Sequence, residues 1–207
     1  MGLYRRYLAP LLINATCSSK VLGRARRATC EGLSGDVLEI GFGAGNNVDF
    51  YPEGVNRVYA VEPSDLAWRL AHRRLATRAL RIERVSTHGE SIDLPDASCD
   101  AALCTFTLCS VADPERTLAE VARVLRPGAI LHLAEHGLAP DPRVARWQRR
   151  LEPLERRVAD GCHLTRDPVE LVIRAGFEFV RLDQGFAPGP RPWTYITVAT
   201  ARRAGPA

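Results

Sequence analysis

The chain has 207 residues, of which 46% are hydrophobic and 25% are charged, so it suits one soluble globular domain with a full core. Its net charge of +4 is small and its arginines are spread along the chain, which does not favour nucleic-acid binding. The sequence shows neither a signal peptide nor an apolar run long enough for a bilayer. We therefore expect a cytoplasmic protein that binds no nucleic acid and does not insert stably into a membrane.

The first segment, from Leu3 to about Arg27, is expected to be helical. Its apolar side chains recur at helical spacing and form one stripe: Leu3, Tyr4, Tyr7, Leu8, Leu11 and Leu12. Such a stripe needs a partner, which can be the body of the domain, a binding site or a membrane surface. We assign residues 1–30 to a helical lid and keep the packed helix and the membrane-surface helix as alternatives.

A glycine-rich turn follows the first predicted strand, Val37 to Ile40. The turn contains Gly41, Phe42, Gly43 and Gly45. Glycine tolerates positive φ and has no Cβ, so the backbone of such a turn can approach a ligand closely. We expect a helix to begin at Asn46 or Asn47 and to direct its N-terminus at that ligand.

Two carboxylates flank this turn. The second predicted strand, residues 56–62, ends at Glu62, where a carboxylate can accept both ribose hydroxyls of a nucleoside. Pro63 follows and can lie against the adenine ring. Glu39 stands just inside the turn, where it can hold a cationic ammonium directly or through water.

The spacing of the glycines separates two cofactor classes. A dinucleotide fingerprint, G-x-G-x-x-G, would need glycine at position 46, where this chain has Asn. Glu39 and the three glycines instead form E-x-G-x-G-x-G, which resembles class I S-adenosylmethionine (SAM) methyltransferases. The resemblance implies SAM as cofactor. A nicotinamide oxidoreductase and a non-catalytic SAM-binding protein remain as alternatives from other classes.

The rest of the chain continues the alternation of strand and helix. Further strands are expected at residues 81–86, 99–107, 129–135, 177–182 and 193–200. Asp113 caps a helix that starts at Pro114. A proline-rich loop joins the last two strands, which suggests an antiparallel pair. We predict one domain over residues 1–207, with the Rossmann-like, seven-stranded sheet of class I methyltransferases, mostly parallel with an antiparallel last strand. Residues 141–166 are expected to form an inserted helix and a substrate loop.

The segment from His88 to Asp100 resembles the adenine-reading stretch D-A-E-x-L-P-F-x-D-x-S-F-D of many small-molecule methyltransferases. His88 replaces the usual aspartate. The resemblance therefore assigns adenine recognition to Gly89, Glu90 and Ser91, although Glu90 can also serve as a helix-capping acid. Thr105, near the end of the strand at 99–107, is assigned to the same cofactor site.

Four motifs occur in the order found in a narrower family. They are Phe106–Val111, Arg123–Gly128, the pair Glu135-His136, and Asp160–Arg166. Together they resemble the methyltransferase-like thiol methyltransferases of animals and their bacterial relatives, over about residues 37–186. The resemblance implies methylation of a small molecule, with a thiol as first choice. A phenol, carboxylate, amine, quinone or phospholipid headgroup remains open as the acceptor, and the oligomeric state is undetermined.

A thiol or phenol acceptor needs help to lose its proton, and histidine is the usual base. His136 follows the fifth strand at its carboxyl end, where ligands of such sheets bind. His163 lies in a loop expected to return over the same end, and we rank it slightly ahead of His136. A structural, hydrogen-bonded imidazole remains the alternative for both residues.

The cysteines show no metal-binding spacing. None of the six forms C-x-x-C, so we expect no metal site. Cys104 and Cys109 lie in an apolar run and are expected to pack as small hydrophobic side chains.

Overall fold

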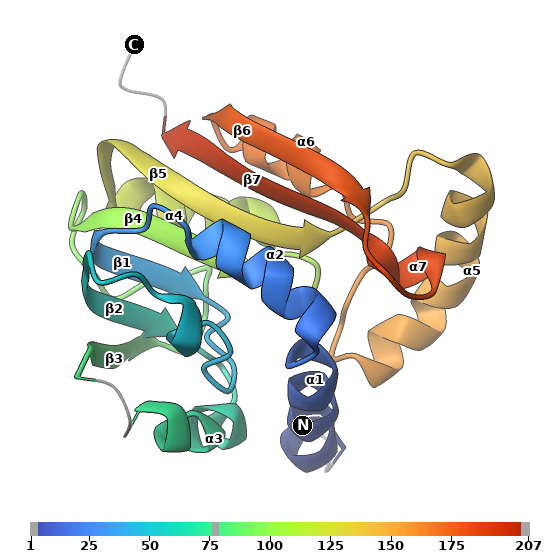
Figure 1. Cartoon of the computed structure of the whole chain (residues 1–207), viewed down its shortest axis with the longest axis horizontal. Coiled ribbons are helices and arrows are strands. Elements are labelled where there is room, and N and C mark those ends of the chain that lie inside the picture. Colours follow the sequence, from blue (N-terminus) through green and yellow to red (C-terminus); the bar gives the residue numbers. More distant parts are fainter. Residues whose placement is uncertain (1–3, 76–78, 204–207) are drawn as a thin grey trace.

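The seven strands form one sheet in the computed structural model, which describes residues 4–75 and 79–203 (Figure 1). They are β1 (Gly35–Ile40), β2 (Val55–Val61), β3 (Arg81–Ser86), β4 (Cys99–Thr105), β5 (Leu125–His136), β6 (Phe177–Phe186) and β7 (Tyr195–Arg203). Their order is β3-β2-β1-β4-β5-β7-β6. The first five are parallel, and β7 is antiparallel to both β5 and β6. The predicted fold class is confirmed.

The helices begin where the sequence supplies caps. They are η1 (Tyr4–Leu8), α1 (Ala9–Cys17), α2 (Lys20–Cys30), η2 (Val48–Phe50), α3 (Asp65–Leu75), α4 (Pro114–Val124), α5 (Pro142–Val158), α6 (Pro168–Arg174) and α7 (Arg191–Thr194). An Asp-Pro pair starts α4, α5 and α6, and each aspartate accepts hydrogen bonds from the first turn. Proline suits this position because its missing N–H would have no helical partner.

The centre of the sheet is buried on both faces, as the alternation of contacts along β1 shows. Val37 belongs to a hydrophobic cluster with Cys30 of α2, whereas Leu38 belongs to a cluster with Leu118 of α4. Successive side chains of a strand point to opposite faces, so a strand covered on both faces is apolar throughout. β1 is therefore held rigidly in the centre of the sheet, and the turn that follows it has a fixed position.

The predicted helix at Asn46 or Asn47 is wrong. The structure has a turn followed by the single 3-10 turn η2. Tyr51 is extended, with φ −63° and ψ 127°, as expected for a residue before proline, because the ring of Pro52 clashes with a helical Tyr51. No long helix N-terminus therefore points from this segment toward the site.

The N-terminal segment divides into two parts. α2 packs against the sheet, where Arg26, Thr29 and Cys30 are buried. η1 and α1 extend past the sheet beyond α2 (Figure 1). The Tyr4 hydroxyl donates a hydrogen bond to the Val158 carbonyl at 2.5 Å, which links η1 to the end of α5.

The predicted apolar stripe faces outward on η1 and α1. Its members Tyr7, Leu8, Leu11 and Leu12 are between 44% and 55% exposed, so about half of their surface stays accessible to solvent. Leu3 lies outside the described residues. Among the helices that the structure describes, none is both long and apolar enough to cross a membrane.

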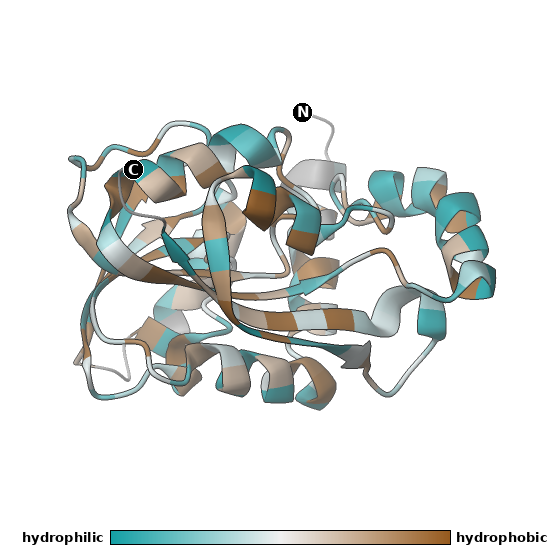
Figure 2. Cartoon of the chain, turned by 90° about the horizontal axis from the view of Figure 1, so that it is seen from above, coloured by the Kyte–Doolittle hydropathy of each residue, from teal (hydrophilic) through white to brown (hydrophobic). Residues whose placement is uncertain are grey.

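The inserted helix predicted at Pro142 to about Ala159 is confirmed as α5. It stands away from the sheet and is mostly hydrophilic in colour, with a few apolar positions (Figures 1 and 2). Trp147 and Leu154 are 54% and 60% exposed. The loop that follows α5 returns to the loop after β4, because the backbone N–H of His163 donates to the Cys109 carbonyl at 2.8 Å.

Candidate active site

A cavity of about 420 Å³ lies beyond the carboxyl ends of β1, β2 and β4. The strand order reverses between β1 and β4, and ligands of open α/β sheets bind at such a switch point. Its volume lies in the range of small-molecule sites. Segments distant in sequence supply the wall: α1, Arg26 of α2, the glycine turn, residues 61–67, residues 87–90, the loop after β4, and Asp160.

The glycine turn fits this site because its backbone needs glycine. Gly41 has φ +72°, and an added Cβ would stand 2.0 Å from the Thr107 hydroxyl oxygen. Gly43 has φ +59°, and its N–H donates to Glu62 Oε2 at 2.6 Å. A side chain at Gly41 would clash, and positive φ disfavours any other residue at both positions.

Glu62 joins the turn to the end of β2. It is 5% exposed and lines the cavity. Its second oxygen, Oε1, accepts a hydrogen bond from the Ser64 N–H at 2.7 Å. Burial raises the pKa of Glu62, against the lowering effect of the Ser64 and Gly43 N–H groups. Each carboxylate oxygen keeps a further lone pair for a ligand hydroxyl.

Glu39 is placed differently from the prediction. It is completely buried and lies behind the part of the wall that the structure describes. Its carboxylate accepts hydrogen bonds from Asn47 Nδ2 at 2.8 Å and from the Tyr51 hydroxyl. Burial raises its pKa to about 7. Glu39 therefore lies outside the described wall, and its predicted role toward an ammonium, directly or through water, stays a prediction.

Arg26 of α2 is a wall residue that the sequence analysis missed. Its Nη1 donates to Asn47 Oδ1 at 2.9 Å and to Thr105 Oγ1 at 2.6 Å, and its guanidinium lies 5.2 Å from the centre of the Phe106 ring. Its Nε is buried without a hydrogen-bond partner among the described residues. The site therefore holds a buried cation with a spare donor. Nothing in the local sequence distinguished Arg26 from the other arginines spread along the chain.

The adenine segment is only partly in the wall. His88, Gly89 and Glu90 line the cavity, whereas Ser91 belongs to a shallower depression beside β3. Glu90 Oε1 accepts a hydrogen bond from the Asp113 N–H at 3.2 Å, so its capping role is present as well. Ser91 therefore lies outside the described wall, and its contact with a cofactor stays a prediction.

The other predicted cofactor residues also lie partly inside and partly outside the described wall of the cavity. Phe42, Pro63 and Thr105 line the cavity together with Gly41 and Gly43. Gly45 does not belong to the described wall. An added Cβ there would stand 3.2 Å from the Val48 side chain, so Gly45 serves packing behind the turn.

Neither predicted base is part of the wall that the structure describes. His163 Nδ1 lies 3.1 Å from Glu152 Oε1 of α5, and the Thr165 N–H donates to Glu152 Oε2 at 2.9 Å. His136 Nε2 lies 3.0 Å from Cys162 Sγ. Both histidines therefore contact α5 or the loop after it, outside the described wall.

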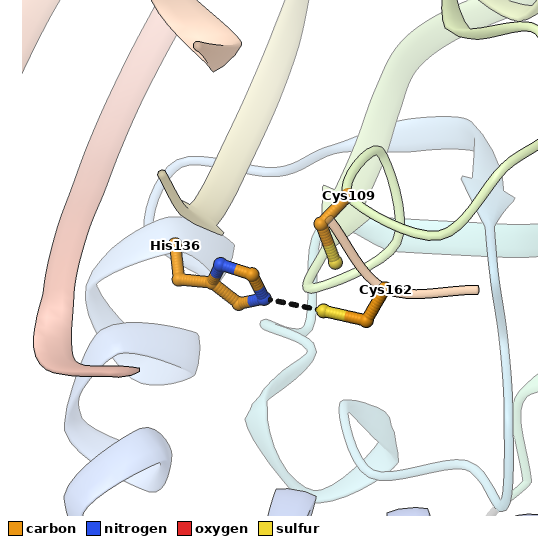
Figure 3. Close-up of side chains that lie close together, drawn as sticks. All are labelled: Cys109, His136 and Cys162. Atoms are coloured by element: carbon orange, nitrogen blue, oxygen red, sulfur yellow. Dashed lines mark hydrogen bonds between the residues drawn. The ribbon is translucent and has the colours of Figure 1, made fainter. Parts of the chain in front are cut away.

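His136 belongs to a cluster with Cys109 and Cys162 (Figure 3). The Cys162 thiol and then the charge of His136 lower the pKa of Cys109 well below its usual range. Burial lowers the pKa of His136, but Cys109 and Glu135 outweigh burial and raise it to about 9. Cys104 packs in the core as expected, whereas Cys109 is corrected from a hydrophobic side chain to a polar partner.

Comparisons with known proteins place the chain in a family. A family model described as a methyltransferase domain matches residues 38–133. The thiol S-methyltransferase TMT1B of Rattus norvegicus is 40% identical over 169 residues, which cover 79% of this chain and 68% of that protein. TMT1B of Homo sapiens is 39% identical over 168 residues, with 78% and 68% covered. This chain belongs to their family of SAM-dependent methyltransferases.

A solved structure agrees on the fold. A SAM-dependent methyltransferase of Thermotoga maritima, described as a possible histamine N-methyltransferase, superposes with a TM-score of 0.69. It is 21% identical, and 97% of this chain and 98% of that chain are covered. Likeness at this identity shows the fold alone. The expected enzyme class, a methyltransferase with SAM as cofactor, is confirmed by the family.

The wall of this methyltransferase fits SAM. The cofactor combines an adenosine with a zwitterionic amino acid end, and it supplies an electrophilic methyl group on a sulfonium. The cavity offers a spare guanidinium donor at Arg26 for a carboxylate and open lone pairs at Glu62 for hydroxyls. The Thr107 side chain, which also lines the cavity, packs directly against Gly41, so only glycine fits at this point of the wall.

Proposed function

We propose that this enzyme transfers the methyl group of SAM to the sulfur of a small thiol, which gives a thioether and S-adenosylhomocysteine. The observation that carries the proposal is the likeness of about 40% to thiol S-methyltransferases over more than three quarters of the chain. The relatives' acceptor is a thiol by name, and the acceptor of this chain follows from the likeness.

The acceptor side of the cavity suits an apolar thiol. Pro10 and Ile13 of α1 face Phe106 and Val111 from the loop after β4, and all four line the cavity. Apolar walls favour an alkyl or aryl group over a charged metabolite. The methyl transfer itself needs alignment of acceptor, methyl group and leaving sulfur, since the sulfide leaves readily.

Different wall residues bind different parts of the cofactor. Arg26 binds the carboxylate of the amino acid end, and Thr105, which accepts a hydrogen bond from Arg26, holds the guanidinium in place. Glu62 accepts hydrogen bonds from the ribose hydroxyls. Gly89 and Glu90 read the adenine. Glu39 acts on the ammonium end through Asn47.

His163, one of the two predicted bases, has a structural role in this proposal. His163 binds Glu152, and Glu152 also accepts hydrogen bonds from Thr165, so the pair fixes the loop after α5. That loop contributes Asp160 to the wall. The acceptor thiol enters as the thiolate, which is a few per cent of a thiol near neutral pH.

The lid is confined to η1 and α1. Pro10, Ile13, Asn14 and Cys17 cover one side of the cavity, while α2 belongs to the core. The tie between Tyr4 and the Val158 carbonyl closes this side against α5. Movement of η1 and α1 gives SAM and the acceptor a way in.

The cellular setting stays a proposal. All six cysteines are free thiols, in agreement with a reducing compartment such as the cytoplasm. The expected absence of a nucleic-acid partner remains a prediction, and the oligomeric state is open.

An acceptor series with matched pairs tests the proposal. The enzyme is incubated with SAM and an alkyl thiol, the alcohol and the amine with the same alkyl group, and a phenol. Methylated products are measured by mass spectrometry. We expect methylation of the thiol and none of the matched alcohol. Methylation of the phenol or amine without any of the thiol would contradict the substrate class and leave the methyltransferase assignment intact.

A further inference from the structure

Cys109, His136 and Cys162 come from three separate elements and meet at one point (Figure 3). Cys109 lies in the loop after β4, His136 ends β5, and Cys162 lies in the loop after α5. We propose that these three side chains bind one soft divalent metal ion, with Zn²⁺ as the first candidate. The inference concerns metal binding and holds for any methyl acceptor.

The distances suit a tetrahedral site. One ligand atom from each residue lies within 4.8 Å of the other two, and His136 Nε2 is 3.0 Å from Cys162 Sγ. Sulfur and nitrogen ligands bound to zinc at about 2.0–2.3 Å stand about 3.5–3.8 Å apart. The three atoms therefore reach a common ion with small side-chain adjustments. Figure 3 shows Nε2 directed toward the sulfurs.

The donor set selects the metal. Two cysteine sulfurs and one imidazole nitrogen favour soft or borderline ions such as Zn²⁺ over Mg²⁺ or Ca²⁺, which prefer oxygen. Cys109 and Cys162 are 4% and 7% exposed, so water competes little for the ion. Three protein ligands leave one position of the tetrahedron open, which a water or a thiolate can take.

The position of the cluster gives the ion a structural consequence. The loop that carries Cys109 also supplies Ser110 and Val111 to the cavity wall, and the loop that carries Cys162 supplies Asp160. An ion bound by both cysteines ties these two loops to the end of β5. It thereby fixes the wall that we assign to the acceptor side.

Two other roles for the cluster make different predictions. A hydrogen-bonded Cys–His group needs no metal, and two neighbouring thiols can be oxidised to a disulfide by a peroxide or an exogenous disulfide. Under reducing conditions a disulfide between the two cysteines is broken. A hydrogen-bonded Cys–His group without a metal-binding role would leave the reduced protein free of metal. Metal binding in the presence of a phosphine reductant therefore separates the proposal from both.

The test measures metal rather than activity. The reduced protein is loaded with Zn²⁺ or Co²⁺ and passed over a desalting column, and bound metal is counted by elemental analysis. We expect one ion per chain, together with the thiolate-to-Co²⁺ charge-transfer absorption. Cys109→Ser, Cys162→Ser and His136→Ala should each lower the metal affinity at least tenfold. Cys17→Ser, which changes a more exposed thiol outside the cluster, should bind as the wild type does.

Further measurements cover variants that fail to fold. X-ray absorption of the loaded wild type should give two sulfur ligands and at least one nitrogen ligand. A strong chelator should lower the melting temperature of the loaded wild type and leave the reduced, metal-free protein unchanged. Failure of the reduced wild type to retain Zn²⁺ or Co²⁺, or an oxygen-only ligand set, would overturn the proposal.

Discussion

Arg26 Nη1 donates a hydrogen bond to Thr105 Oγ1 at 2.6 Å, which fastens α2 to the carboxyl end of β4. The same guanidinium nitrogen donates to Asn47 Oδ1 in the segment after the glycine turn. One buried cation therefore joins the N-terminal helix to both strands at the switch point. α2 consequently contributes to the wall of the cavity as well as to the core.

Arg26→Gln should weaken SAM binding about tenfold or more, because it removes one charge-assisted hydrogen bond to the carboxylate. Methylthioadenosine lacks the amino acid end and should bind both proteins equally. Arg27→Gln is the control, since Arg27 lies on the same helix and stacks on Phe50 instead of lining the described wall. Calorimetry measures both ligands. Equal SAM affinity in wild type and a folded Arg26→Gln would refute the assignment.

Glu62→Gln should weaken SAM and methylthioadenosine alike, by about tenfold, since both ligands carry the ribose. The Glu62 carboxylate accepts from the Gly43 N–H of the glycine turn and from the Ser64 N–H after β2, and the amide oxygen of glutamine keeps one of these two hydrogen bonds. Glu83→Gln on the exposed face of β3 serves as control. A loss of affinity for SAM without a loss for methylthioadenosine would place Glu62 at the amino acid end of the cofactor instead.

Deletion of residues 1–18 should leave the sheet folded and lower turnover, because it removes η1 and α1 and keeps α2. Deletion of residues 1–30 should prevent folding, since it exposes the surface covered by Thr29 and Cys30, which are 1% and 0% exposed. Melting curves and turnover are measured for both. Full activity of the shorter deletion would show that η1 and α1 are no lid.

Local signals made much of the fold predictable. The Asp-Pro pairs, the glycine turn and the apolar strand at 99–107 each depend on neighbouring residues, and each is found in the structure. Contacts between distant residues were not predictable in this way. Arg26 and Thr105 are 79 positions apart, and His136 and Cys162 are 26 apart. No spacing rule joins them, because the sheet topology alone decides which loops meet.

In the absence of SAM, the Glu39→Gln variant should become more stable than the wild type as pH rises. Burial raises the pKa of the Glu39 carboxyl from 4.5 in the unfolded chain to about 7 in the folded protein. The folded state therefore binds more protons between these pH values, and its stability falls as pH rises. The full effect is about 3 kcal/mol above pH 7. Glutamine accepts from Asn47 and donates to Tyr51, so we expect the variant to be more stable than wild type there and similar below pH 4.5. Urea unfolding at several pH values measures the difference, and a constant difference across that range would contradict the cause.

His163 has two alternative roles, which are to fix the loop after α5 or to act as a general base. If His163 fixes the loop after α5 through Glu152, His163→Ala should raise KM for the thiol and lower the melting temperature, with kcat within a few-fold of wild type. A general base would behave differently. Its loss would lower kcat about 10²-fold, and the deficit would shrink as pH rises toward the pKa of the free thiol.

The neighbouring contacts provide matched variants for this test. Glu152→Gln should reproduce the effect of His163→Ala, because it weakens the same pair and the same contacts to Thr165. His163→Asn should restore part of the lost affinity if hydrogen bonding to Glu152 is the role, since asparagine also has an N–H donor. The pH–rate profiles of all three variants are compared with that of the wild type. A large kcat loss confined to the His163 variants and relieved at high pH would identify His163 as the base and overturn its structural role.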